Sequence, residues 1–293
     1  LNWSIDPIDL SGMADIDASV ILKSPSINYK GFNLKNADLS VSIEKGFFRT
    51  NKFTGLIFEG LLEASIESTL NSRPQMKVII DTKGVDLEQA TSALNGAPIA
   101  GGTMGLQVSL NSAGSNEAEL VSGLSGNGLM QFNDINVYKG RNGTMLAGAL
   151  GLVASMNQVS GLLGNTKKAS GLVDISGSFV IRRGVAKSSD LRIISDLGDG
   201  EAKGVVNIPK WGIDVKGNVK LGQNILTDLI SRSAQKKISQ KVPFAIYGKL
   251  DAPNIKLDTS KITGGVLHIP GADKLLKKLP KGVGGVLEGL LGG

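Results

Sequence analysis

The side chains that most often carry out catalysis are scarce in this sequence of 293 residues, which has no cysteine and a single histidine. Thiol catalysis, disulfides, Cys-based zinc or iron–sulfur sites and multi-histidine metal sites are therefore excluded. A serine hydrolase would have to use His268 as its general base, and the sequence lacks the Gly-x-Ser-x-Gly turn that presents such a serine. We expect His268 to be a partly exposed strand residue.

Closely spaced carboxylates are a second source of chemistry, because two convergent Asp or Glu side chains can hydrolyse glycosides. Such pairs include Asp15/Asp17, Glu117/Glu119 and Asp196/Asp199. Alternation places most of them at polar positions, so we expect solubilising charges. The glycine-rich segment 96–103 lacks the lysine of a phosphate-binding loop and contains a proline. We predict that the protein is not an enzyme and has no cofactor and no metal site.

Strict alternation of apolar and polar residues is the dominant pattern in the chain. In segment 37–44, for example, Ala, Leu, Val and Ile alternate with Asp, Ser, Ser and Glu. Similar runs follow at 62–67, 76–81, 104–110, 173–181, 202–208, 213–221 and 242–250. Turns such as Lys45-Gly46 and Arg183-Gly184 separate them at hairpin-like spacing. The pattern predicts an antiparallel meander of roughly ten to twelve strands with one apolar face.

Four segments break this pattern and are predicted to be helical: 86–95, 115–124, 142–163 and 223–240. We expect Asp86 to cap the first helix and Ser115 to cap the second. Segments of about 27–96 and 171–240 share an order of strands and glycine turns followed by a helix, which is a weak internal repeat. Since no low-complexity linker interrupts the chain, we predict one extended domain over residues 1–263.

Glycine is over-represented, with 39 residues in the chain against a usual share of about 7%. One group follows a polar or charged residue in turns where positive φ is expected: Gly46, Gly60, Gly184 and Gly200. A second group lies on the apolar side of the alternation: Gly177, Gly204, Gly217 and Gly248. A missing side chain lets a sheet bend or a ligand approach. We therefore predict a strongly curved sheet with the second group at the bend.

A sheet with one apolar face must cover that face with a second sheet, with helices or with a ligand. The apolar residues fit the filled core of a β-sandwich that serves as a structural or protein-interaction domain. They also fit an open groove, because four short helices cannot cover about a dozen strands spaced ~4.8 Å apart. The residue pattern leaves both interpretations open.

Five segments in order along the chain resemble the C-terminal region of the AsmA-like proteins of Gram-negative bacteria. They are 3–10 (WSIDPIDL), 84–89 (GVDLEQ), 124–128 (LSGNG), 171–192 (GLVDISGSFVIRRGVAKSSDLR) and 242–258 (VPFAIYGKLDAPNIKLD). The resemblance implies a mainly β (α+β) fold, in which a long, strongly curved antiparallel sheet forms an apolar groove with a few short helices at its ends and edges. It also implies the periplasmic ectodomain of an inner-membrane-anchored protein, whose anchor is absent from this sequence.

The same resemblance implies a non-enzymatic groove that binds phospholipid and forms part of a conduit between the inner and outer membranes, in outer-membrane biogenesis. An outer-membrane or periplasmic protein is the expected partner. Small and aliphatic side chains without charge suit acyl chains. The predicted lining consists of Ala64, Ile66, Val78, Ile80, Leu106, Val108, Gly177, Val206, Val215, Gly217, Val219 and Ile246.

Residues 264–293 are predicted to form an amphipathic C-terminal tail. Leu275, Leu276 and Leu279 oppose Lys277 and Lys278, a pattern that suits contact with a membrane surface or the end of the groove, with a frayed terminus as the alternative. The net charge of +6 arises from 32 basic and 26 acidic residues. Because the small basic clusters lack interleaved aromatic residues, we do not expect nucleic acid as a partner.

Overall fold

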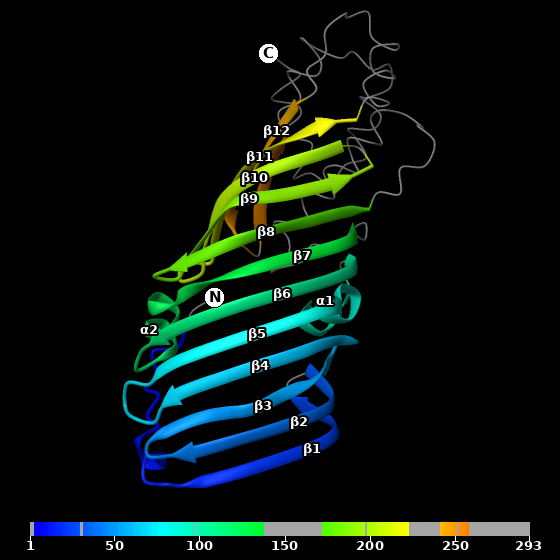
Figure 1. Cartoon of the computed structure of the whole chain (residues 1–293). Helices are drawn as coiled ribbons and strands as arrows, with labels where there is room; N and C mark the ends of the chain where they lie inside the picture. Colours follow the sequence, from blue (N-terminus) through cyan, green and yellow to red (C-terminus); the bar gives the residue numbers. More distant parts are fainter. Residues whose placement is uncertain are drawn as a thin grey trace, which may run out of the picture.

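The computed structural model describes residues 3–29, 32–95, 97–98, 100–137, 172–196, 198–222, 241–250 and 252–257. Within them, thirteen strands form one sheet in sequential order, and each strand pairs antiparallel with its chain neighbour. Figure 1 shows the strands stacked as a ladder. The sheet is open, with β1 and β13 as its edges. The predicted antiparallel meander is confirmed, and no second sheet exists in the described ranges to make a sandwich.

The strands and helices have the following bounds: η1 (Ser11–Met13), β1 (Ala18–Tyr29), β2 (Phe32–Glu44), β3 (Phe47–Ile57), β4 (Gly60–Thr69), β5 (Gln75–Asp86), α1 (Leu87–Asn95), β6 (Ala100–Ala113), α2 (Glu117–Gly123), β7 (Ser125–Val137), β8 (Val173–Arg182), β9 (Val185–Ser195), β10 (Gly198–Asn207), β11 (Gly212–Leu221), β12 (Lys241–Lys249) and β13 (Ala252–Leu257). Figure 1 places α1 and α2 at opposite ends of the strands.

The two described α-helices test the predicted caps. The prediction for α1 is confirmed, since the Asp86 carboxylate accepts a hydrogen bond from the Gln89 N–H at 2.8 Å. The prediction for α2 is wrong by one residue, because Asn116 is the N-cap and accepts from the Glu119 N–H at 2.9 Å. The Ser115 N–H instead donates to the Glu119 carboxylate. The predicted helices 142–163 and 223–240 lie outside the described residues.

The turn glycines follow the prediction in two cases of four. Lys45-Gly46 and Arg183-Gly184 both adopt positive φ, as a tight antiparallel hairpin requires. The prediction for Gly60 is wrong, because Phe58 and Glu59 make that turn with φ of 48° and 60°. Gly200 is likewise not among the positive-φ residues. At Gly60 the missing side chain matters for another reason, since a Cβ atom would lie 2.5 Å from the Val85 nitrogen.

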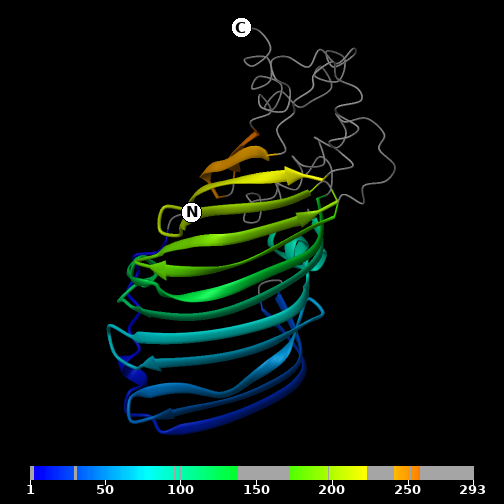
Figure 2. The same ribbon diagram turned by 45° about the horizontal axis from the view of Figure 1, so that its top comes forward.

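Residues 3–17, which we call the N-terminal strap, cross the turn ends of the sheet on the side where α2 lies (Figure 2). Hydrogen bonds fix the strap to successive connections: Trp3 Nε1 to Ile208 O, Ala118 N to Ser4 O, Ile8 N to Ser115 O, Leu10 N to Asn71 O, and Lys45 N to Asp17 Oδ1. The Trp3 and Trp211 rings meet edge to face with centroids 6.0 Å apart. The strap therefore ties turns that are far apart in the sequence.

Threonine hydroxyls replace backbone acceptors where the strand register slips. The pairing of β5 with β6 slips between Thr82 and Val85, and the Leu106 N–H donates to Thr82 Oγ1 at 3.1 Å. The pairing of β3 with β4 also slips, and there the Ile66 N–H donates to Thr50 Oγ1 at 2.7 Å. Both threonines are buried, at 8% exposure. The hydroxyls thus satisfy amide groups that would otherwise be buried without a partner.

We expect Thr82→Val to lower the free energy of unfolding by about 1–3 kcal/mol, although valine has the same shape, because the Leu106 N–H loses its acceptor. Thr103→Val is the matched control, since Thr103 is exposed on the neighbouring strand, and we expect it to change stability by less than about 0.5 kcal/mol. Urea unfolding followed by circular dichroism measures both. Equal losses in the two variants would contradict the assigned role of the hydroxyl.

Candidate functional site

The register of the strands places the aliphatic side chains of the central sheet on one face. Ala64 pairs with Ile80, and Ile80 pairs with Val108. In the next row, Leu106 pairs with Met130, which pairs with Gly177. Because directly paired antiparallel residues point to the same side of a sheet, these rows form one surface. We call it the aliphatic face.

The same face continues toward the far end of the sheet. Gly200 of β10 pairs with Val219 of β11, which pairs with Val242 of β12. Val215 pairs with Ile246 in another row of the same face. Following the pairs from β4 to β12 places all twelve residues of the predicted lining on the aliphatic face. The structure thus brings together positions that are far apart in the sequence.

The aliphatic face has two parts that differ in burial. Over β7 to β12 it contains a buried cluster in which Val219, Phe244 and Ile246 are each at most 4% exposed, although Val206 and Val215 are half-buried. Over β4 to β6 it is half-buried, since Ala64, Val78 and the other lining residues there are partly accessible, with Val108 as the buried exception. The half-buried part is therefore the more accessible stretch of the face.

No Asp, Glu, Lys or Arg occupies a register position on this face among the described residues of β4 to β12. Most of its hydroxyl groups bond to the backbone, and Ser188 Oγ donates to the Asp190 carboxylate at 3.2 Å. Ser68 Oγ donates to Thr69 O at 3.1 Å, and Ser195 Oγ donates to Gly198 O at 2.9 Å. Together with Thr50 and Thr82, these groups have their hydrogen bonds within the protein. They therefore leave an apolar ligand little polar surface to desolvate.

Aromatic rings cover two glycines on this face. A Cβ atom on Gly128 would lie 2.4 Å from the Phe179 ring, and a Cβ atom on Gly217 would lie 2.6 Å from the Phe244 ring. Ring-over-glycine packing across strands compensates for the missing side chain. These pairs were not predicted from the sequence, although Gly and Phe lie at alternate positions within 126–132, 177–179 and 244–248.

The four glycines predicted at a bend all lie on the aliphatic face. Gly177, Gly204 and Gly217 each have a neighbour closer than 3.0 Å to the position of a Cβ atom. Gly248 has φ of +108°. Steric overlap with a neighbour or positive φ therefore explains why each of these positions is glycine. The bend itself stays a prediction.

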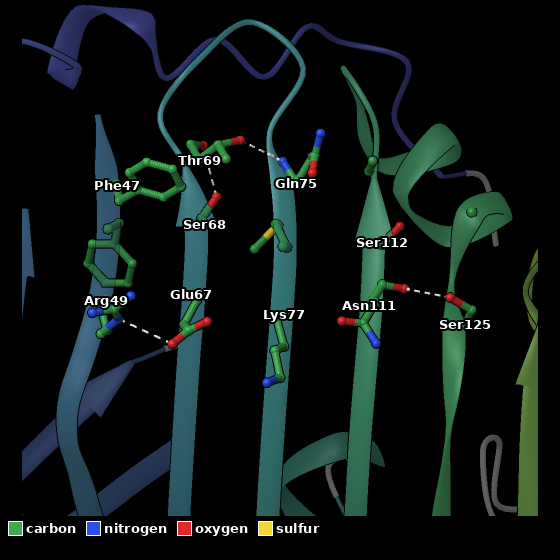
Figure 3. A pocket seen from close by; sticks show the side chains of 14 residues that line it. Phe47, Arg49, Glu67, Ser68, Thr69, Gln75, Lys77, Asn111, Ser112 and Ser125 are labelled. Atoms are coloured by element: carbon green, nitrogen blue, oxygen red, sulfur yellow. Dashed lines mark hydrogen bonds and ion pairs between the residues drawn. The ribbon is translucent and has the colours of Figure 1, made fainter. Parts of the chain in front are cut away.

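The opposite face, which we call the polar face, carries paired charges. Lys52 donates to the Asp38 carboxylate, and this hydrogen bond, assisted by the charge of Lys23, lowers the pKa of Asp38 below its ordinary value. Arg49 and Glu67 form an ion pair at 3.2 Å. Figure 3 shows these two residues side by side, with Lys77 and Asn111 on the following strands. They line a hollow of about 520 Å³ together with residues in register with the aliphatic face, such as Ser68 and Met76. This surface suits contact with water.

Three of the six carboxylates singled out in the sequence have structural roles. Asp17 accepts a hydrogen bond from the Lys45 N–H, and Glu117 accepts one from the Ser4 N–H. Glu119 forms an ion pair with Arg73 at 2.7 Å. Within the described ranges, no group of three or more His, Asp or Glu residues is arranged to hold a metal ion.

The predicted contacts of the C-terminal tail lie outside the described residues. They are Leu275, Leu276, Lys277, Lys278 and Leu279. His268 lies outside the described residues as well. The amphipathic tail and its contact with a membrane therefore stay predictions.

Two further features were not predicted from the sequence. Segment 3–10 was recognised only as a motif, and its role in joining turns depends on contacts such as Trp3 with Trp211. The hydroxyls of Thr50 and Thr82 matter because of register slips, which depend on the partner strand. The available signal in the sequence was a threonine at a position where the alternating pattern expects an apolar residue. A hydroxyl group buried at such a position needs a hydrogen-bond partner.

The fold and this face define a class of protein: an open antiparallel meander with one aliphatic face, one charged face and turns tied by a strap. A model of the AsmA family matches residues 1–140, just under half of the 293-residue chain. Residues 1–140 are therefore similar to the AsmA family, which agrees with the resemblance of the sequence motifs. No curated protein and no solved structure matches it significantly.

The family gives a coarse functional setting. AsmA proteins are bacterial envelope proteins and are associated with outer-membrane assembly and lipid transport. Within the described ranges, no helix has the length and apolar character needed to cross a membrane.

We expect Gly217→Ala to lower the free energy of unfolding by about 1–3 kcal/mol, because the added methyl group would overlap the Glu201 carbonyl and the Phe244 ring. Gly212→Ala is the matched control on the same strand, since its Cβ atom would meet nothing closer than 3.6 Å. Thermal or urea unfolding compares the two variants. A Gly217 variant as stable as the Gly212 variant would contradict the close packing of Phe244 on Gly217.

Proposed function

We propose that this chain is a non-enzymatic lipid-binding groove, part of a conduit that moves phospholipid between the inner and outer membranes. The observation that carries the proposal is the aliphatic face, which runs from β4 to β12 without a charged side chain in register. The family association with outer-membrane assembly and lipid transport supports the same setting. In this proposal the sheet curves so that the aliphatic face is concave.

Acyl chains match the chemistry of this face. Burial of a methylene group contributes about 0.8 kcal/mol, so a 16-carbon chain offers up to roughly 12 kcal/mol before ordering costs. Binding of this kind needs no specific polar contact, and the face offers few free polar groups. The half-buried stretch over β4 to β6, which includes Ile66, Val78 and Leu106, is the proposed place of contact.

The dimensions of the sheet suit a path rather than a single pocket. Thirteen strands have twelve intervals, and at ~4.8 Å each they span about 58 Å. This length exceeds the ~30 Å hydrocarbon core of a bilayer. The charged polar face would meanwhile keep the outside of the conduit wetted in the periplasm, where we place the protein as an ectodomain. An outer-membrane or periplasmic protein at the end of the path is the proposed partner.

Mass spectrometry of lipids extracted from the detergent-free protein tests binding directly. We expect phospholipid to co-purify with the chain at levels above those of an unrelated control protein. Absence of phospholipid, together with no binding of a fluorescent phospholipid added to the purified protein, would contradict the proposal.

A charged variant tests the location of the site. We expect Val78→Glu combined with Val215→Glu to weaken phospholipid binding by about tenfold or more, because an acyl chain would have to desolvate two carboxylates. Ile79→Glu combined with Asn218→Glu is the matched control, since both residues are exposed on the polar face. Circular dichroism checks that each variant is folded. Leu106→Trp, which fills space without adding charge, should also reduce binding, and equal binding by all variants would exclude the aliphatic face.

A further inference from the structure

The turns that the strap crosses form one rim of the sheet, and the charge of this rim changes along its length. Where the strap covers it, the basic residues are paired: Lys45 lies 3.3 Å from Glu44, and Arg73 lies 2.7 Å from Glu119. The strap itself contains four aspartates and no basic residue. Its contacts end at Trp3, beside the turn between β10 and β11. This stretch of the rim is therefore balanced or acidic.

The next stretch of the same rim carries four exposed basic residues, which we call the basic rim: Arg182, Arg183, Lys210 and Lys249. The first two lie at the hairpin between β8 and β9, the third lies in the turn between β10 and β11, and the fourth ends β12. Figure 1 shows β8 ending on the side of the sheet where α2 lies. None of the four forms an ion pair within the part of the chain that the structure describes.

Contacts between the turns hold the basic rim in place. The Ile208 N–H donates to Gly184 O at 3.0 Å, and the Leu250 N–H donates to Trp211 O at 2.9 Å. A Cβ atom on Gly184 would lie 2.5 Å from Pro209 Cγ, so the first two turns touch. The three turns are thus tied to one another, and their backbone needs little ordering before a partner binds.

We propose that the basic rim docks an acidic segment of a protein that lies alongside the sheet. Several unpaired charges of one sign attract the opposite charge from solution. Guanidinium groups such as those of Arg182 and Arg183 also bind carboxylates through two parallel hydrogen bonds. The choice of a protein over a bilayer rests on the proposed function, because in a conduit between two membranes this rim faces the space between them.

The spacing of the turns indicates the form of the docked segment. Successive turns on one rim are two strands apart, which is about 10 Å. Residues seven positions apart on an α-helix lie on the same face and are also about 10 Å apart along its axis. A helix with carboxylates at seven-residue intervals would therefore meet the three turns in succession.

Titration of the full chain with a designed peptide tests the docking. The probe is an alanine-rich helical peptide of about 20 residues with pairs of glutamates at seven-residue intervals, and a peptide of the same composition with its glutamates grouped at one end is the control. We expect the spaced peptide to bind at least about fivefold more tightly. Tryptophan fluorescence is the readout, because the two tryptophans of the chain, Trp3 and Trp211, lie beside the basic rim.

Paired variants test the location. Arg183→Gln combined with Lys210→Gln should weaken binding of the spaced peptide by about tenfold, and high salt should reduce the difference. Lys203→Gln combined with Lys220→Gln is the matched control, since it removes the same charge from exposed positions of the polar face. Circular dichroism checks that both variants are folded.

The rim variant should bind phospholipid like the parent chain, so a failure of the docking proposal can be told from a failure of the lipid-binding proposal. Equal losses in the rim variant and its control, or no preference for the spaced peptide, would overturn docking at the rim. Binding of anionic phospholipid vesicles through Arg183 and Lys210, without binding of the peptide, would overturn it in favour of contact with a membrane.

Discussion

The backbone ladder imposes one constraint on everything else in this sheet: each strand must keep its apolar residues on the same side. Side chains alternate with a period of two, so a slip of one residue would move a whole strand's apolar set to the polar face. The ladder does slip, between Thr82 and Val85 in β5 and between Phe132 and Ile135 in β7. In both cases one strand contains an extra residue, which shifts the alternation of apolar and polar positions along the sequence. The apolar residues on either side of the extra residue nevertheless lie on the same face.

The residues inside these slips explain why the chain tolerates them. Gly84 and Asp134 have positive φ, so they turn the backbone out of the regular pleat. The Leu106 amide, which faces the slip in β5, bonds to the Thr82 hydroxyl. A slip thus needs a residue that accepts left-handed backbone and, where an amide is buried, a side chain that replaces the missing acceptor. The aliphatic face is continuous across the slips because these residues accommodate the extra position, so that the following apolar side chains return to the same side.

Much of this architecture could be predicted from alternation alone, because a half-buried strand has a simple period. Segment 37–44 and the other alternating runs correspond to strands, and the twelve predicted lining residues share one face. The slips could not be predicted, since each depends on the partner strand. Competition between equivalent cap residues explains one other error, because Asn116 caps α2 in place of Ser115. The turn assigned to Gly60 is instead made by Phe58 and Glu59, two residue types from which positive φ is not expected.

A sheet in which each strand pairs only with its chain neighbours leaves two kinds of surface without a partner. One is the aliphatic face, which the described ranges do not cover with a second sheet, and the other is the pair of sheet edges at β1 and β13. The N-terminal strap covers neither, because it joins turn ends, as in the bond from Trp3 to Ile208. The aliphatic face is at least partly accessible over β4 to β6, so it favours association with something outside the ladder. Pairing each strand with its chain neighbour therefore produces both the scaffold and the apolar face that is available for association.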